Sequence, residues 1–265
     1  SNGIVTNIWL ENEEQLEKFA QEDIKYLFVD VGGLDSQGKI TTPENEITSF
    51  LSFIKDFEEK KGYSFFVLPY TEIIINKDYS LDSGIFVGNL VKEYSRLVDL
   101  GFDGVHIDVE AIPFSQRGEY LEFLEKLDKS IGKGKLITVY AGTSNENPNI
   151  WEWEPEFYRN VADRADIILI PGYDFGLEDE EQYKNYVKGQ IGFIENKEWN
   201  SKFMFAIPTH KKEPETIDNA LDAFSDIKLS ETESRFIGIT IFAEWTTDEK
   251  EWEIFENYLK DARKI

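Results

Sequence analysis

Strand-like apolar runs alternate with charged, helix-like segments along this chain, and this alternation is the feature that most limits its possible folds. Eight runs rich in β-branched and aromatic residues predict strands, and between them apolar residues recur at the i, i+3, i+4 and i+7 spacing of amphipathic helices. The predicted strands are residues 4–10, 26–33, 64–72, 104–110, 135–142, 166–174, 202–210 and 236–245. The clearest predicted helices are residues 44–62, 88–101, 118–132 and 248–264, and several of them stop at Gly.

A strand followed by a helix, repeated eight times, is typical of the α/β class and of one architecture within it. The chain has 265 residues, close to the roughly 250 of a typical (β/α)8 barrel. We therefore expect a (β/α)8 TIM barrel that forms a single domain over residues 1–265. An open, doubly wound sheet is the structural alternative, but no Gly-rich phosphate loop follows the first predicted strand.

Charge and composition narrow the range of partners. The 52 acidic residues against 28 basic ones give a formal net charge of -24, which disfavours nucleic acid and anionic membrane surfaces and favours an uncharged ligand. With no cysteine, the chain has no disulfide and no thiol chemistry. No apolar run approaches the roughly 20 residues of a membrane helix. We expect a monomer. Because the sequence starts at Ser1 without Met, one interpretation is that a leader was removed, and we expect a secreted or cell-surface protein.

In (β/α)8 barrels the functional residues lie at the carboxyl ends of the strands. Polar or aromatic residues end every predicted strand, and we expect them to converge on one rim. They are Trp9, Asp30, Tyr70, Glu110, Tyr140, Tyr173, Asp174, His210, Glu244 and Trp245. The loop after the fifth predicted strand adds Trp151 and Trp153, one of which is expected to line a ligand subsite.

The fourth predicted strand carries the most informative segment, "DGVHIDVE" at residues 103–110. Residues two apart on a strand share a face, so His106, Asp108 and Glu110 point one way while the apolar residues between them point the other. Two carboxylates directed into a barrel interior carry a large desolvation cost unless they are paired. The polar face therefore indicates a functional site.

This segment resembles the fourth-strand signature of family-18 glycoside hydrolases, the chitinases and endo-β-N-acetylglucosaminidases, which reads D-G-x-D-x-D-x-E. Asp103, Gly104, Asp108 and Glu110 match the pattern, and His106 replaces the middle Asp. Weaker similarities are "LFVDVGGLDSQGKI" at 27–40, "PGYD" at 171–174 and "AIPTH" at 206–210. The sequence departs from the family at "LPYTE" (68–72), which lacks S-x-G-G, and at the eighth strand, where Ala243 occupies the slot of the sugar-stacking Trp and Trp245 follows two residues later.

The resemblance implies a retaining, substrate-assisted cleavage of β-linked N-acetylglucosamine. Glu110 would be the general acid, and a negative Asp108 about 6.6 Å away along the strand would help to keep it protonated. Asp108 is badly placed as a nucleophile because it lies deeper on the same strand. In the family, the sugar's own acetamido oxygen attacks instead, and Asp108 would stabilise the resulting oxazolinium.

The resemblance also assigns the surrounding residues. Tyr173 would donate its hydroxyl to the acetamido oxygen, Asp174 would bind a sugar hydroxyl, and Trp245 would stack on the sugar. We also expect Tyr70 and Tyr140 to contact the substrate. His106 is expected either to donate to Asp108 as an imidazolium or to be a neutral histidine that is hydrogen-bonded to a backbone carbonyl.

Three functions remain compatible with the sequence. The first is a glycosidase acting on chitin, peptidoglycan or an N-glycan core. The second is a chitinase-like lectin, although such proteins typically lose the acid Glu, which is retained here as Glu110. The third is a barrel glycosidase of another family that pairs Glu110 with Glu244 or Asp174. Two histidines and no EF-hand spacing predict no metal site and no cofactor.

Overall fold

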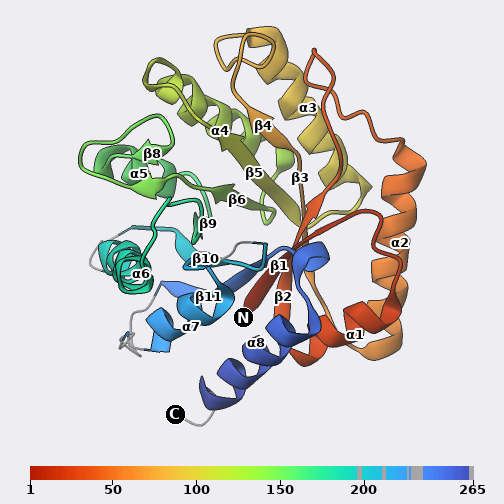
Figure 1. Cartoon of the computed structure of the whole chain (residues 1–265). Helices are drawn as coiled ribbons and strands as arrows, with labels where there is room; N and C mark the ends of the chain where they lie inside the picture. Colours follow the sequence, from red (N-terminus) through yellow and green to blue (C-terminus); the bar gives the residue numbers. More distant parts are fainter. Residues whose placement is uncertain (196–198, 211–212, 226, 228–234, 263–265) are drawn as a thin grey trace.

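The computed structural model describes residues 1–195, 199–210, 213–225, 227 and 235–262. Its nine-stranded sheet runs in the order β3-β2-β1-β11-β10-β9-β6-β5-β4, and all of these strand pairs are parallel. Figure 1 shows the strands at the centre, with the helices arranged around the outside. The predicted TIM barrel is confirmed.

The bounds of the elements are as follows. The barrel strands are β1 (Asn2–Asn7), β2 (Ile24–Asp30), β3 (Phe66–Tyr70), β4 (Glu72–Ile74), β5 (Gly104–Glu110), β6 (Leu136–Tyr140), β9 (Ile167–Pro171), β10 (Lys202–Pro208) and β11 (Phe236–Phe242). Two short strands, β7 (Thr143–Ser144) and β8 (Glu152–Trp153), pair with each other outside the barrel. The α-helices are α1 (Glu13–Gln21), α2 (Glu44–Lys61), α3 (Gly84–Leu100), α4 (Arg117–Ile131), α5 (Pro155–Ala162), α6 (Glu180–Glu195), α7 (Ile217–Ser225) and α8 (Glu249–Ala262).

The third predicted strand, residues 64–72, is divided in two at Thr71. Its first part, β3, pairs with β2, and its second part, β4, pairs with β5. The two ends of the nine-strand order are therefore consecutive in the sequence. This divided strand closes the ring, so that eight strand positions are filled by nine strands.

Most predicted strands extend too far at their carboxyl ends, because the chain turns into loops at the rim. The strand predicted over 166–174 ends at Pro171, and Asp174 takes a left-handed conformation with φ of 66°. The helix predicted over 88–101 begins earlier, at Gly84, because the Ser83 side chain caps it by accepting a hydrogen bond from the Phe86 amide. Residues 263–264 of the last predicted helix lie outside the described residues.

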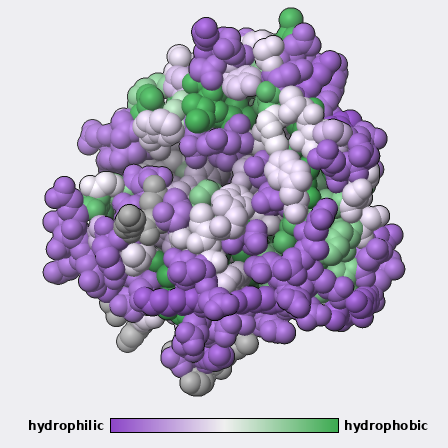
Figure 2. Space-filling view, turned by 45° about the vertical axis from the view of Figure 1, so that its right-hand side comes forward, coloured by the Kyte–Doolittle hydropathy of each residue, from purple (hydrophilic) through white to green (hydrophobic). Residues whose placement is uncertain are grey.

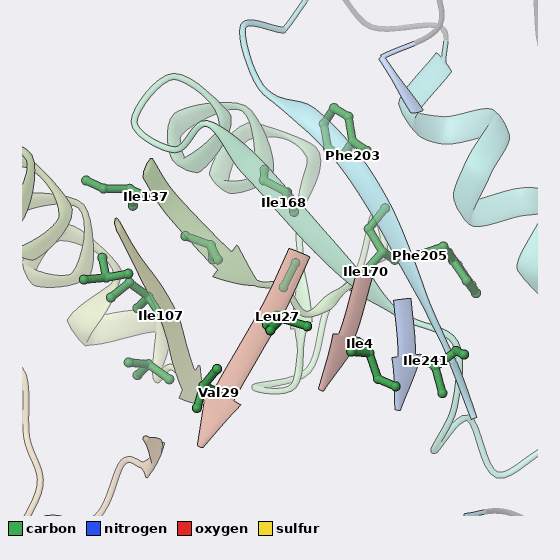
Figure 3. Packing of buried hydrophobic residues seen from close by; sticks show 14 of the residues in the cluster. Ile4, Leu27, Val29, Ile107, Ile137, Ile168, Ile170, Phe203, Phe205 and Ile241 are labelled. Carbon is green, nitrogen blue, oxygen red and sulfur yellow. The ribbon is translucent and has the colours of Figure 1, made fainter. Parts of the chain in front are cut away.

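Alternate residues on each strand enter two separate apolar layers. Strand residues facing outward pack with the helices in the larger cluster, and Figure 3 shows several of them on β1, β2, β5, β6, β9, β10 and β11. Residues of opposite parity, such as Val5, Phe28 and Leu169, form the smaller cluster in the barrel interior. On β5 the outward residues are Val105, Ile107 and Val109, which confirms the face predicted to be ordinary core. Each such fully buried side chain contributes roughly 1.5–3 kcal/mol.

The outer surface reflects the acidic composition. Figure 2 shows a mainly hydrophilic surface interrupted by small apolar areas. Among the described residues, no helix combines the length and the apolar character needed to cross a membrane.

We expect Gly104→Ala to destabilise the barrel. A Cβ at this position would lie 2.1 Å from the Leu136 carbonyl oxygen of the neighbouring strand, so the backbones of β5 and β6 would have to separate. Overpacking of about 1–3 kcal/mol should lower Tm by roughly 2–12 °C in a thermal melt. The matched control is Gly88→Ala within α3, where nothing lies within 4 Å of the added methyl group, and Tm should stay level or rise. An unchanged Tm for Gly104→Ala would contradict the tight pairing of these strands.

Candidate active site

A cavity of about 700 Å³ opens at the carboxyl ends of the barrel strands, within the usual size range of small-molecule sites. Its walls combine carboxylates with aromatic rings. The carboxylates are Asp30, Glu72, Asp108, Glu110 and Asp174. The rings are those of Tyr70, His106, Tyr140, Tyr173, Phe175, His210, Phe242, Trp151, Trp153 and Trp245.

All eight residues singled out as site residues from the sequence border this one cavity. They reach it because each lies on the inward face of its strand or in the loop that follows. Two other residues of the predicted rim do not border it. Trp9 lies in the turn after β1 with 57% of its surface exposed, and Glu244 is half-buried in a short 3-10 helix after β11.

Glu110 and Asp108 are partly buried carboxyl groups on the inward face of β5. Burial raises the pKa of Glu110 to about 7, and the negative charges of Glu72 and Asp174 add to this effect. Burial also raises the pKa of Asp108 well above its usual range, with further contributions from Glu110, Glu72 and Asp30. The Oδ1 atom of Asp108 is buried without a hydrogen-bond partner, which adds to the cost of ionising this carboxyl group. The surroundings therefore favour the protonated form of both carboxyl groups.

His106 lies directly below this pair and is a neutral histidine. Its Nδ1 is 2.8 Å from the Thr138 hydroxyl, which itself donates to the Val105 carbonyl oxygen. Because that hydroxyl has only one proton, Nδ1–H of His106 must be the donor. Burial lowers the pKa of His106 to about 3. This favours the neutral alternative over the imidazolium, with a threonine hydroxyl in place of the expected backbone carbonyl.

Two tyrosines form a directed hydrogen bond across the cavity wall. The Tyr140 hydroxyl donates to the Tyr173 hydroxyl at 2.7 Å. Burial raises the pKa of both groups, so both remain neutral. Since Tyr173 accepts from Tyr140, its own proton is directed elsewhere and is available to a ligand.

Further aromatic rings pack around Tyr173 along the cavity wall. The Tyr173 ring lies 4.9 Å from the His210 ring and 5.0 Å from the Phe242 ring, and Trp245 follows 6.4 Å from Phe242. Trp245 borders the cavity with 50% of its surface exposed. Ala243, by contrast, is fully buried in the interior cluster.

The two tryptophans of the loop after β6 behave differently. Both border the cavity, but Trp153 is buried against Phe157 and Tyr158. Trp151 is 52% exposed. Of the two, Trp151 therefore offers the free ring face.

The "DGVHIDVE" segment divides into a structural half and a site half. Asp103 lies at the amino-terminal end of β5, where its Oδ2 accepts a hydrogen bond from the Val67 amide at 2.8 Å. Gly104 allows β6 to approach closely. His106 and residues 108–110, toward the carboxyl end, border the cavity, and their polar side chains are those of His106, Asp108 and Glu110.

Sequence reasoning missed three contributors to the site. Glu72 ends a predicted strand and stands outside the predicted site, but it pairs in register with Asp108 and borders the cavity. Phe242 lies within an apolar run of the sequence. The alternation of inward and outward residues along β11 is the signal that could have placed its side chain at the cavity. Glu215 gave no signal, because its contacts are with a loop about 40 residues away. In the described part of the chain, no group of three or more His, Asp or Glu side chains is arranged to hold a metal ion.

Comparisons with known proteins agree with this geometry at the level of the fold. No family model matches the sequence. The chain is 23% identical over 154 residues to YvbX of Bacillus subtilis (strain 168), described as an uncharacterized glycosylase. This match covers 53% of the chain and 44% of that protein, so it spans less than half of the relative's length.

Solved structures match over nearly the whole chain. The spore cortex-lytic enzyme SleL of Bacillus cereus superposes with a TM-score of 0.65 at 11% identity, covering 97% of this chain and 74% of SleL. A class V chitinase from Pseudomonas fluorescens Pf-5 gives a TM-score of 0.64 at 13% identity, covering 97% and 99%. A chitinase from Rhizomucor miehei gives 0.64 at 11% identity, covering 98% and 99%. At these identities the likeness establishes the shared barrel fold.

Proposed function

We propose that this protein is a retaining glycoside hydrolase that cleaves β-linked N-acetylglucosamine-containing glycans with assistance from the substrate. The observation that carries the proposal is the pair Asp108 and Glu110, which lie two residues apart on the inward face of β5 and border the cavity, with the pKa of both raised. A group poised to give up a proton near neutral pH is what a general acid requires. The glycosylase and chitinase names of the similar proteins support the same class.

In the proposed reaction, Glu110 donates its proton to the glycosidic oxygen as the bond from that oxygen to the anomeric carbon breaks. The acetamido oxygen of the same sugar bonds to the anomeric carbon, giving an oxazolinium. Asp108 accepts the hydrogen bond of the acetamido N–H and stabilises the positive charge, while Tyr173 donates to the acetamido oxygen. Water then attacks the anomeric carbon and Glu110 takes a proton from the water. The oxazolinium ring opens, and the anomeric configuration is retained.

The two alternative functions are less well supported by the geometry. A carboxylate pair formed with Glu244 is disfavoured because Glu244 does not border the cavity. A lectin has no need for an acid whose pKa is raised to about 7. Asp174 remains the candidate partner for an ordinary carboxylate pair, since it borders the cavity close enough to raise the pKa of Glu110.

The direct test is incubation with chitooligosaccharides, with N-glycosylated protein and with peptidoglycan fragments, and product analysis by mass spectrometry. An N-acetyl-thiazoline inhibitor tests the mechanism, because it resembles the oxazolinium and should bind more tightly than the sugar. Binding without turnover of any glycan would favour the lectin. Turnover without inhibition by the thiazoline would favour a carboxylate pair.

The pH dependence of kcat/KM follows from the protonation state of Glu110. The acid form is needed, so kcat/KM should fall as the pH rises through about 7. The ionisable groups that face Glu110 are Glu72, Asp108, Tyr140, Tyr173 and Asp174. Glu72→Gln removes a negative charge that raises the pKa of Glu110, and the falling limb should therefore move to lower pH.

This shift should shrink at high salt, because Glu72 is exposed and its charge is screened. The matched control is Glu46→Gln, which removes a charge from the exposed surface of α2 away from the cavity. It should leave the pH limb in place. A pH profile of Glu72→Gln that superposes on that of the wild type would contradict the assigned role of the Glu72 charge.

A further inference from the structure

The loop that carries Tyr173 and Asp174 is held by one buried carboxylate, Glu215. Glu215 lies in the segment between β10 and α7, and only 7% of its surface is exposed. Its Oε2 accepts the Asp174 amide at 2.6 Å, and its Oε1 accepts the amides of Phe175 and Gly176 at 2.9 and 3.1 Å. Three successive backbone N–H groups thus converge on one side chain.

The N–H groups of residues 174–176 form an anion-binding nest, and the anion that they bind is the Glu215 carboxylate of the same chain. Asp174 and Gly176 both have left-handed backbone conformations, with φ of 66° and 65°. Residues other than Gly adopt this conformation uncommonly, although Asp does so more readily than most. Without an acceptor, the three amides would lose their partner in a half-buried loop, so the carboxylate selects this backbone conformation over the alternatives.

The same loop is fixed on its other side by α6. The Tyr183 hydroxyl donates to the Gly172 carbonyl at 2.7 Å, and the Phe175 ring lies 4.3 Å from that of Tyr186. The first contact holds the start of the loop and the second packs the Phe175 side chain, whereas Glu215 binds the backbone N–H groups of residues 174–176. Asp174 borders the cavity close to Glu110, and its charge acts on that residue.

We propose that Glu215 is a positioning residue, which presents Asp174 to the cavity and holds the neighbouring Tyr173 hydroxyl in place by binding the amides of residues 174–176. The proposal rests on the proposed glycosidase function for its kinetic readouts. Glu215 does not border the cavity and touches no reacting atom. Its effect on catalysis is transmitted through the backbone of the loop.

The test uses Glu215→Gln in the full chain, with chitooligosaccharides as the substrate. Gln has the same shape, but one of its two terminal groups is an NH2 donor, which must face an amide donor of the nest. We expect kcat/KM to fall roughly 10 to 100-fold, as for displacements of about 1 Å in active sites. The falling limb of the pH profile should also move to lower pH, because the Asp174 charge moves away from Glu110.

The matched control is Glu213→Gln. Glu213 belongs to the same segment, is exposed, and its described hydrogen bond is to the Asn219 side chain at 3.0 Å. It should leave both kcat/KM and the pH limb unchanged. Asp174→Asn completes a double-mutant cycle. If Glu215 acts through Asp174, Glu215→Gln should cost much less in the Asp174→Asn background than in the wild type.

One further measurement and one further variant keep the outcome decisive. Amide hydrogen exchange at residues 174–176 should speed up in Glu215→Gln, and this readout does not depend on any activity. If the wild type turns over no glycan, the proposed function fails while hydrogen exchange still tests the nest. If Glu215→Gln does not fold, Glu215→Asp replaces it, since it keeps the charge and shortens the reach. The proposal would be overturned if the folded variant kept the wild-type hydrogen exchange, kcat/KM and pH profile. It would also be overturned if the effects of the two substitutions in the double-mutant cycle were fully additive.

Discussion

Replacing Glu110 with Gln is expected to lower kcat for chitooligosaccharide hydrolysis by roughly 10² to 10⁴-fold, the usual contribution of a general acid. Gln has nearly the same shape, so the cavity and the binding of the sugar should be preserved. The amide is far too weak an acid to protonate the glycosidic oxygen. Initial rates should be measured together with the Kd for the same oligosaccharide by calorimetry.

The falling limb of the pH profile near pH 7 should also disappear in Glu110→Gln, because this limb reports the ionisation of Glu110. The matched control is Asp103→Asn, which lies in the same eight-residue segment but at the opposite end of β5. Its amide oxygen can still accept from the Val67 amide, so kcat should be retained. If Glu110→Gln kept the wild-type kcat, Glu110 would not be the acid and the proposed mechanism would fail.

Asp108→Asn is expected to lower kcat/KM by roughly 10² to 10³-fold, comparable to the loss of one group that stabilises transition-state charge. Asn keeps the size of the side chain but carries no negative charge to stabilise the oxazolinium. The loss should therefore arise in the transition state, with KM changed much less than kcat.

An N-acetyl-thiazoline separates this role from a general disturbance of the site. If Asp108 stabilises the oxazolinium, the Kd of the thiazoline should rise in Asp108→Asn by about the same factor as kcat/KM falls. The Kd of the intact oligosaccharide should change little. Equal weakening of both ligands would assign Asp108 to ground-state binding instead, and unchanged thiazoline affinity would remove Asp108 from the mechanism.

The divided strand at the third barrel position illustrates why strand boundaries are harder to read than strands. Residues 64–72 are apolar and β-branched enough to indicate one strand, but pairing changes at Thr71 from β2 to β5. No local pattern marks this change, because it depends on where the two neighbouring strands lie. The same holds for the rim, where strands predicted to reach Asp174 and Trp245 end earlier and continue as loops.

The inward face of β5 was predictable because strand parity is a strictly local property. His106, Asp108 and Glu110 alternate with apolar residues, and that pattern by itself indicated a polar site within a barrel. The charge state of these groups was not predictable to the same degree. The neutral form of His106 depends on its burial and on Thr138 of the neighbouring strand, and neither can be read from the segment.

The sequence by itself determined the βα alternation, the barrel class and the residues that end the strands, because each follows from periodicities of two and 3.6 residues. Only the tertiary structure decided which distant groups act on those residues. Glu72 reaches Glu110 across a strand pair, and Glu215 holds Asp174 from a segment 41 positions away. Electrostatic and hydrogen-bond contacts depend on distance in space, and this distance is set only when the strands close into a ring.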